Sequence, residues 1–145
     1  INFKKPLTGS DLILKEQEPF AGYTRGDVTV TLVAASKLTL GAPLVRAKGV
    51  AAAKWTPLTA ADQLVATNEV AFYLADTLGQ FLEIGPGPAG DVKCAAIVRG
   101  EIILKDKAIK NAAKVNFAAF ADADFVKLKE MAASQAIIIE KVLGA

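Results

Sequence analysis

The chain has 145 residues, a net charge of +2 and 52% hydrophobic residues, with a mean hydropathy of +0.35. Its length predicts a single domain that buries a core without metals or disulfides. The low net charge argues against a dedicated nucleic-acid-binding protein. Apolar runs such as Ala136–Ile139 fall far short of the roughly 20 residues that a membrane helix needs, so no membrane partner is expected.

The chemical inventory is short, because the sequence has no histidine and a single cysteine, Cys94. Histidine is the commonest general base and metal ligand near neutral pH, and the usual zinc sites need histidine or several cysteines. Cys94 lies in the apolar run Val92–Val98, which predicts a buried thiol. We therefore expect no catalytic, cofactor-binding or metal-binding residues. A small enzyme that uses lysine and carboxylates is the alternative, with Lys93 as its candidate Schiff-base lysine.

Residues 1–25 differ from the rest, because they mix charges, prolines and scattered apolar residues without helical or strand periodicity. We interpret them as an extended N-terminal arm, and residues 26–145 as a single domain. The arm is either a flexible terminus or a segment that orders on a partner, for example by adding a strand to the partner's sheet. Its apolar content favours the second interpretation.

Short strands are expected through the first half of the domain. The β-branched, alternating segment Val28–Val33 predicts a strand. Leu38–Val45 predicts two strands around a tight Gly-Ala-Pro turn, and Lys54–Leu58 predicts another short strand. Thr59–Thr67 is expected to form one helical turn and a loop, and the apolar segment Glu69–Leu74 a buried strand.

The next segments contain a sequence that formally matches a dinucleotide-binding loop, Gly85–Gly90. Its prolines lack N–H groups, and no helix is expected after it, so we interpret it as a surface turn. Phe81–Ile84, Val92–Val98 and Glu101–Leu104 predict strands. Asp106–Lys114 is either a short helix or an exposed loop.

The C-terminal part gives the clearest helix, with Asp122 as its expected N-cap and Phe125, Leu128 and Ala132 on one face. Ser134 and Gln135 end it, and a final strand is expected over Ala136–Leu143. The chain is therefore expected to close on a helix followed by a strand.

The order of these elements resembles the phage lambda-type head decoration, or capsid cement, family. The resemblance spans roughly Tyr23 to Leu143, and it depends on the order of several weak signals rather than on one diagnostic motif. The segments that carry it are Tyr23–Val30, Leu38–Leu44, Lys54–Leu58, Cys94–Leu104, Asp122–Ala133 and Ala136–Leu143.

The resemblance implies an α+β, β-rich fold: a small barrel-like or β-tulip body with a C-terminal helix, a terminal strand and the extended N-terminal arm. It implies a homotrimer that binds the major capsid protein at local three-fold sites on the outer surface of the expanded head. The protein would be in the host cytoplasm before assembly, would resist the pressure of packaged DNA and would need no cofactor. The chain departs from short family members by a longer arm and by extra residues around Thr59–Gly90.

The resemblance also suggests contacts. We expect Ile1, Phe3 and Leu7 to anchor the arm on the capsid and Lys4 and Lys5 to meet capsid carboxylates, so that deleting residues 1–14 leaves a folded trimer that no longer binds heads. The full set of candidate arm contacts is Ile1, Phe3, Lys4, Lys5, Leu7, Leu12, Ile13 and Leu14. Trp55, the single tryptophan, is expected in the core, with a trimer or capsid contact as the alternative. Alternative functions are a tail-associated virion domain, a generic binding module and the small enzyme.

Overall fold

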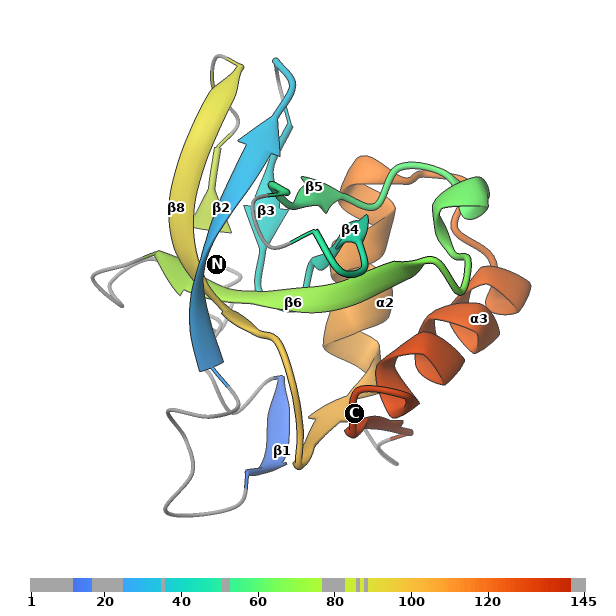
Figure 1. Ribbon diagram of the computed structural model, residues 1–145. Coiled ribbons are helices and arrows are strands. Elements are labelled where there is room, and N and C mark those ends of the chain that lie inside the picture. The colour runs from blue at the N-terminus through green and yellow to red at the C-terminus, as the bar shows by residue number, and fades with distance from the viewer. Residues whose placement is uncertain are drawn as a thin grey trace, which may run out of the picture.

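A computed structural model describes residues 12–16, 25–34, 36–50, 53–76, 83–85, 87 and 89–141 of the chain. The described part is rich in strands and carries both long helices on one side of them (Figure 1). This confirms the predicted α+β class, with a C-terminal helix followed by a strand. The elements are β1 (Ile13–Glu16), β2 (Arg25–Leu32), β3 (Leu38–Thr39), β4 (Pro43–Ala47), β5 (Thr56–Pro57), the 3-10 turn η2 (Ala61–Gln63), β6 (Asn68–Asp76), β7 (Glu83–Ile84), β8 (Gly90–Ile97), β9 (Ile102–Lys105), α2 (Asp106–Asn116), α3 (Asp122–Ala133) and β10 (Ile137–Glu140).

The main sheet closes into a barrel-like body. Its five strands are antiparallel neighbours in the order β2-β8-β6-β4-β5, and β2 turns Val28 and Val30 to its buried face. Trp55, next to β5, bridges Val30 in parallel and joins the two ends of the sheet. The Trp55 N–H donates to the Thr29 carbonyl at 3.0 Å, and the Thr31 N–H donates to the Trp55 carbonyl at 2.8 Å. These two bonds replace the open edges with a continuous wall at this level.

Strand β6 separates two apolar clusters. Val70, Phe72 and Leu74 pack against the helices, whereas Ala71 and Tyr73 pack inside the barrel. All of these side chains are at most 7% exposed. Because both faces of the strand are covered, its sequence is an uninterrupted apolar run rather than an alternating one. The buried strand predicted over this segment is therefore confirmed.

The segment Asp106–Lys114, which the sequence left as either a short helix or an exposed loop, forms helix α2. Ile109, Ala112 and Ala113 lie on its buried face, and the small alanines let the helix approach the barrel closely. The side-chain amide of Asn116 holds its C-terminal end by donating to the Lys37 carbonyl at 2.8 Å. Lys107 and Lys114 are exposed and Asp106 is buried, and these interspersed charges mask the pattern in the sequence.

Helix α3 confirms the predicted buried face, which consists of Phe125, Leu128 and Ala132. The predicted N-cap, Asp122, is wrong by one position, because Ala121 has extended backbone and Asp122 is the first helical residue. The Asp124 carboxylate accepts the Ala121 N–H at 3.0 Å. The acidic residue that accepts a hydrogen bond at the N-terminus of this helix is therefore Asp124, in the first turn.

A smaller sheet corrects the boundary predicted for the arm. Strand β1 lies within residues 1–25, yet it pairs antiparallel with β9, while β10 pairs parallel with the other edge of β9. Leu12 is fully buried in the helix-side cluster, and Ile13 is partly buried against it. The sequence of β1 shows no periodic pattern of apolar residues. The segment is defined as a strand only by its packing against β9 and the helices.

Hydrogen bonds and close packing form a junction between the α3–β10 turn and the barrel. The side-chain amide of Gln135 accepts the Val70 N–H at 2.9 Å and donates to the carbonyls of Val70 at 2.7 Å and Val98 at 3.1 Å. The Gly100 N–H donates to the Gln135 carbonyl at 2.9 Å. A Cβ on Gly100 would lie 1.6 Å from the Ala136 carbonyl oxygen, so only glycine fits there. The junction holds the β8–β9 connection against the α3–β10 turn.

Candidate interaction sites

The outward face of the three-stranded sheet carries aliphatic side chains next to the charged residues Lys105 and Glu140. Leu14 on β1 and Ile138 on β10 are 47% and 49% exposed, and Ile103 on the central strand β9 pairs with Ile138 between them. Leu14 and Ile138 are exposed and Ile103 is half-buried, so three adjacent strands each place one aliphatic side chain at this surface. We call Leu14, Ile103 and Ile138 the sheet patch.

The two ends of the described chain meet at one end of this sheet. Ile13 of β1 and Ile139 of β10 both lie opposite Leu104 of β9, from its two sides. The chain before Leu12 and the chain after Lys141 are therefore attached beside the sheet patch. Of the predicted arm contacts, Leu14 is exposed there.

The seven remaining arm assignments change or stay open. Leu12 belongs to the core and Ile13 is partly buried against it, so the proposed capsid contact by Leu12 is corrected to a structural role. The predicted contacts Ile1, Phe3, Lys4, Lys5 and Leu7 lie outside the described residues. Any deletion that removes only the arm must consequently stop before Leu12.

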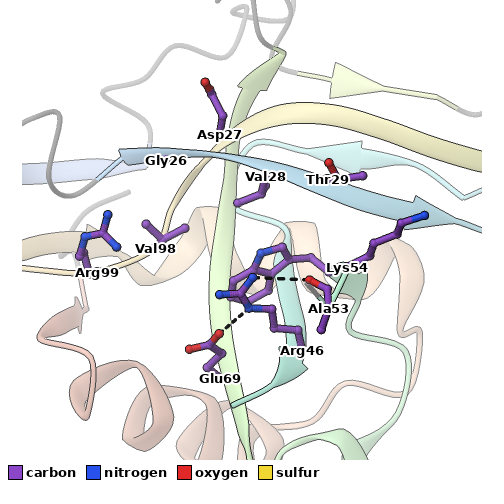
Figure 2. A pocket seen from close by; sticks show the side chains of 11 residues that line it. Gly26, Asp27, Val28, Thr29, Arg46, Ala53, Lys54, Glu69, Val98 and Arg99 are labelled. Atoms are coloured by element: carbon purple, nitrogen blue, oxygen red, sulfur yellow. Dashed lines mark hydrogen bonds and ion pairs between the residues drawn. The ribbon is translucent and has the colours of Figure 1, made fainter. Parts of the chain in front are cut away.

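A second candidate site is a pocket of about 460 Å³ in the barrel wall, where β2 faces β4, β6 and the segment before β5 (Figure 2). Its walls are mostly polar, and its aliphatic lining residues are Val28, Ala53 and Val98. The charged and aromatic residues that line it are Asp27, Arg46, Lys54, Trp55, Glu69 and Arg99.

Trp55 forms part of this pocket although it is only 3% exposed. The prediction that it packs in the core is confirmed. The Arg46 guanidinium carbon lies 4.5 Å from the centre of the indole ring. Arg46 Nε donates to the Glu69 carboxylate, and its Nη1 donates to the Ala53 carbonyl at 3.5 Å (Figure 2). A cation held over the indole face by a carboxylate gives this part of the pocket a fixed geometry.

Sequence reasoning missed the pocket. Arg46 is the one charged residue of β4, Glu69 precedes the apolar run of β6, and the two lie opposite each other in the β4–β6 register. A charged residue next to an apolar stretch of strand was the signal that the sequence offered for this pocket. The register that brings the two side chains together depends on long-range pairing, which the sequence alone does not specify.

Beside the pocket, Asp91 joins two parts of the barrel wall. Its carboxylate accepts from Lys54 Nζ at 2.5 Å and from the Thr31 hydroxyl at 2.9 Å. These hydrogen bonds, the one from Lys54 foremost, hold the pKa of Asp91 below its usual value. Lys54 and Asp91 are 56% and 41% exposed, so water and salt screen this ion pair.

Cys94 lies on the opposite face of β8 from its neighbour Lys93. The thiol is fully buried in the barrel cluster, as predicted. Burial, with a smaller effect of the Asp27 carboxylate, raises the pKa of Cys94 to about 12. Lys93 is exposed, so it does not meet the requirement of a Schiff-base lysine for an apolar pocket.

The described residues contain no group of three or more His, Cys, Asp or Glu side chains placed to hold a metal ion. No helix in the part of the chain that the structure describes has the length and apolarity to cross a bilayer. The segment after Gly85 continues into strand β8 rather than a helix, which removes the N-terminus that a dinucleotide phosphate would need.

Comparisons with known proteins gave no match: no family model fits the chain, and no curated protein or solved structure is significantly similar to it.

Proposed function

We propose that this chain is a non-enzymatic virion protein that binds the outer surface of an expanded phage head as a trimer and stabilises the capsid. The observation that carries the proposal is the sheet patch, with the attachment point of an apolar N-terminal segment at its edge. The resemblance of the element order to the decoration family gives the partner, which is the major capsid protein.

The anchoring of β1 supports this proposal. Leu12 is buried in the core, and the Lys105 N–H donates to its carbonyl at 2.7 Å. A segment that starts from a fixed strand has fewer conformations to lose on binding than one attached through a flexible linker. This matters, because ordering the backbone costs about 1–2 kcal/mol per residue.

The binding energy would come from many modest contacts. Burial of Ile1, Phe3 and Leu7 would contribute roughly 25 cal/mol for each Å² of apolar surface removed from water. Lys4 and Lys5 would add charge complementarity to capsid carboxylates, and the sheet patch would extend the contact on the body. A trimer would engage three such seams at once, which raises the effective concentration of each contact.

The residue types of the chain support a function that does not involve catalysis. It has no histidine, its cysteine thiol is buried with a raised pKa, and Lys93 is exposed. A structural protein needs surface complementarity and stability rather than a reactive group. The small-enzyme alternative therefore has no nucleophile in a suitable setting among the described residues.

The test is co-sedimentation of the purified protein with empty expanded heads of the phage that encodes it. The full chain is expected to bind and to sediment as a trimer when free. Deletion of residues 1–11 is expected to keep the trimer and abolish binding, whereas deletion through residue 14 would also damage the fold, because it removes Leu12. Undiminished head binding by the 1–11 deletion would overturn the role of the arm, and specific binding to tails would favour a tail-associated protein.

A further inference from the structure

The surface between helix α3 and the turn that follows η2 is hollowed into a groove of about 360 Å³, which we call the α3 groove. Its size is within the range of small-molecule sites, about 300–1,000 Å³. One wall is a single face of α3 with its C-cap, and the other comes from the end of β4 and the turn after η2. The residues that line it are Lys48, Leu64, Val65, Ala66, Lys127, Glu130, Met131 and Ser134.

The floor of the α3 groove is an edge of the helix-side core. Leu64 is 6% exposed and belongs to that cluster, and Met131 is partly buried against it. Val65 lies beside them with 42% of its surface exposed. An aliphatic chain in the groove would contact these three side chains and remove their apolar surface from water, which favours binding.

Hydrogen bonds fix the wall opposite α3. The side-chain amide of Asn68 donates to the Gln63 carbonyl at 2.9 Å, and its backbone N–H donates to the Val65 carbonyl at 3.0 Å. The Lys48 N–H donates to the Thr67 carbonyl at 3.0 Å and holds Lys48 beside this turn. Because both walls are built from hydrogen-bonded backbone, binding requires little ordering of the chain.

The charged groups of the α3 groove are two lysines and one glutamate. Lys48 and Lys127 are exposed, one on each wall, and neither forms an ion pair with a carboxylate of the described residues. Glu130 is exposed on the α3 wall and forms no ion pair with either lysine. The Ser134 hydroxyl donates to the Met131 carbonyl at 2.6 Å. The groove therefore has an excess of positive charge beside an apolar floor, which attracts an anion.

We propose that the α3 groove binds a small amphipathic carboxylate, of the class of medium-chain fatty acid anions. Its carboxylate would lie between Lys48 and Lys127. Its aliphatic chain would lie against Leu64, Val65 and Met131. The two lysines select a negative charge, and the apolar floor selects a ligand that carries an aliphatic chain beside that charge. This binding site goes beyond the proposed capsid function and does not depend on it.

Met131 supplies the readout, because it is the only methionine in the sequence and lines the groove. The full-length protein, isotope-labelled at the methionine methyl group, is titrated with sodium octanoate at neutral pH and low ionic strength. The NMR shift of the methyl signal, assigned by its loss in Met131→Leu, is recorded. We expect a saturable shift with a Kd on the order of 1 mM for so small a ligand.

Two further ligands separate the effects of the charge and the chain. Octylammonium has the same chain and the opposite charge, and it is expected to bind at least roughly tenfold more weakly than octanoate. Hexanoate keeps the carboxylate and lacks two CH₂ groups. It is expected to bind roughly four- to fifteenfold more weakly, because less apolar surface is buried against the floor.

Matched substitutions test whether the groove residues are responsible. Lys48→Gln and Lys127→Gln are each expected to weaken octanoate binding roughly two- to fivefold, whereas Glu130→Gln is expected to strengthen it to a similar extent. Lys107→Gln removes the same charge from an exposed position on α2 outside the groove, and it is expected to leave the Kd unchanged. All four side chains are exposed, so these variants are expected to fold.

The proposal is overturned if octanoate gives no saturable shift up to about 10 mM, well above the expected Kd. It is also overturned if octylammonium or hexanoate binds as tightly as octanoate, or if the two groove lysine variants bind octanoate no differently from Lys107→Gln. The titrations use the free protein without heads, so none of these results bears on capsid binding.

Discussion

The barrel has a covered side and an open side, and they are built from the same kind of strand. On the covered side, β6 is packed on both faces, and the Gln135 side chain occupies backbone groups of Val70. On the open side, β2 has one packed face, and its edge at Asp27 meets a polar pocket. The difference indicates that stability is concentrated around β6 and the helices, while β2 contributes less packing around Asp27.

The largest expected effect is on the covered side, at Gly100. Gly100→Ala would place a Cβ 1.6 Å from the Ala136 carbonyl oxygen, so the α3–β10 turn must separate from the barrel. We expect a loss of more than about 4 kcal/mol in the free energy of unfolding, or no folded protein at all. The matched control is Gly87→Ala, where an added Cβ has no neighbour within 4 Å. Urea denaturation of both variants measures the contrast, and equal stabilities would contradict the packing described for the junction.

The next effect tests whether β1 belongs to the covered side. Leu12→Ala removes a fully buried side chain and is expected to cost about 2–5 kcal/mol in the free energy of unfolding. Leu14→Ala, two residues further on, changes a side chain that is 47% exposed and is expected to cost less than about 1 kcal/mol. Chemical denaturation distinguishes them. Similar small effects at both positions would indicate that Leu12 belongs to the arm rather than to the core.

Gln135 is expected to give an intermediate effect. Gln135→Ala leaves the N–H and C=O of Val70 without their side-chain partner, which is expected to cost about 1–3 kcal/mol. Ser134→Ala removes only an exposed hydroxyl that donates to the Met131 carbonyl, and it is the control. Thermal unfolding of the two variants provides the comparison, and a larger loss for the serine variant would contradict the assigned role.

Cys94 reports on the closure of the barrel with no change in sequence. Burial raises the pKa of its thiol from 9.0 to about 12, so the folded chain holds this proton more tightly than the unfolded chain. The associated stability is complete below pH 9 and is lost as the pH rises toward 12. At pH 8 we expect a thiol reagent to label the native protein at least roughly a hundredfold more slowly than the urea-unfolded protein. Rapid native labelling would show that the barrel interior is accessible.

The smallest effect is expected on the open side. Lys54→Ala breaks the exposed pair with Asp91, and we expect no measurable change in the midpoint of thermal unfolding at neutral pH. The lowered pKa of Asp91 means that the pair contributes only while the carboxylate is charged, and this contribution disappears as the pH falls below the usual aspartate range. A marked loss of stability at neutral pH would show that the open side also contributes substantially to the stability of the fold.

The sequence was most informative where burial follows a local period. The face of α3 with Leu128 and the alternation of β2 were both predicted correctly. The α2 segment could not be decided, because its lysines conceal a face of alanines and Ile109. Strand β1 was missed, because its stability comes from β9, which lies far along the chain.

The candidate sites were less predictable than the fold. The pocket needs the β4–β6 register that places Arg46 opposite Glu69, together with the closure at Trp55. The sheet patch needs three strands from both ends of the chain. Such features come from long-range pairing and have no local signature.

The most direct test of the proposed capsid role is electron cryomicroscopy of empty expanded heads from the phage that encodes the chain, prepared without the protein and then mixed with it. We expect added trimeric density at the local three-fold positions, with the sheet patch and the N-terminal segment facing the capsid. Heads that show no added density at saturating protein would contradict it.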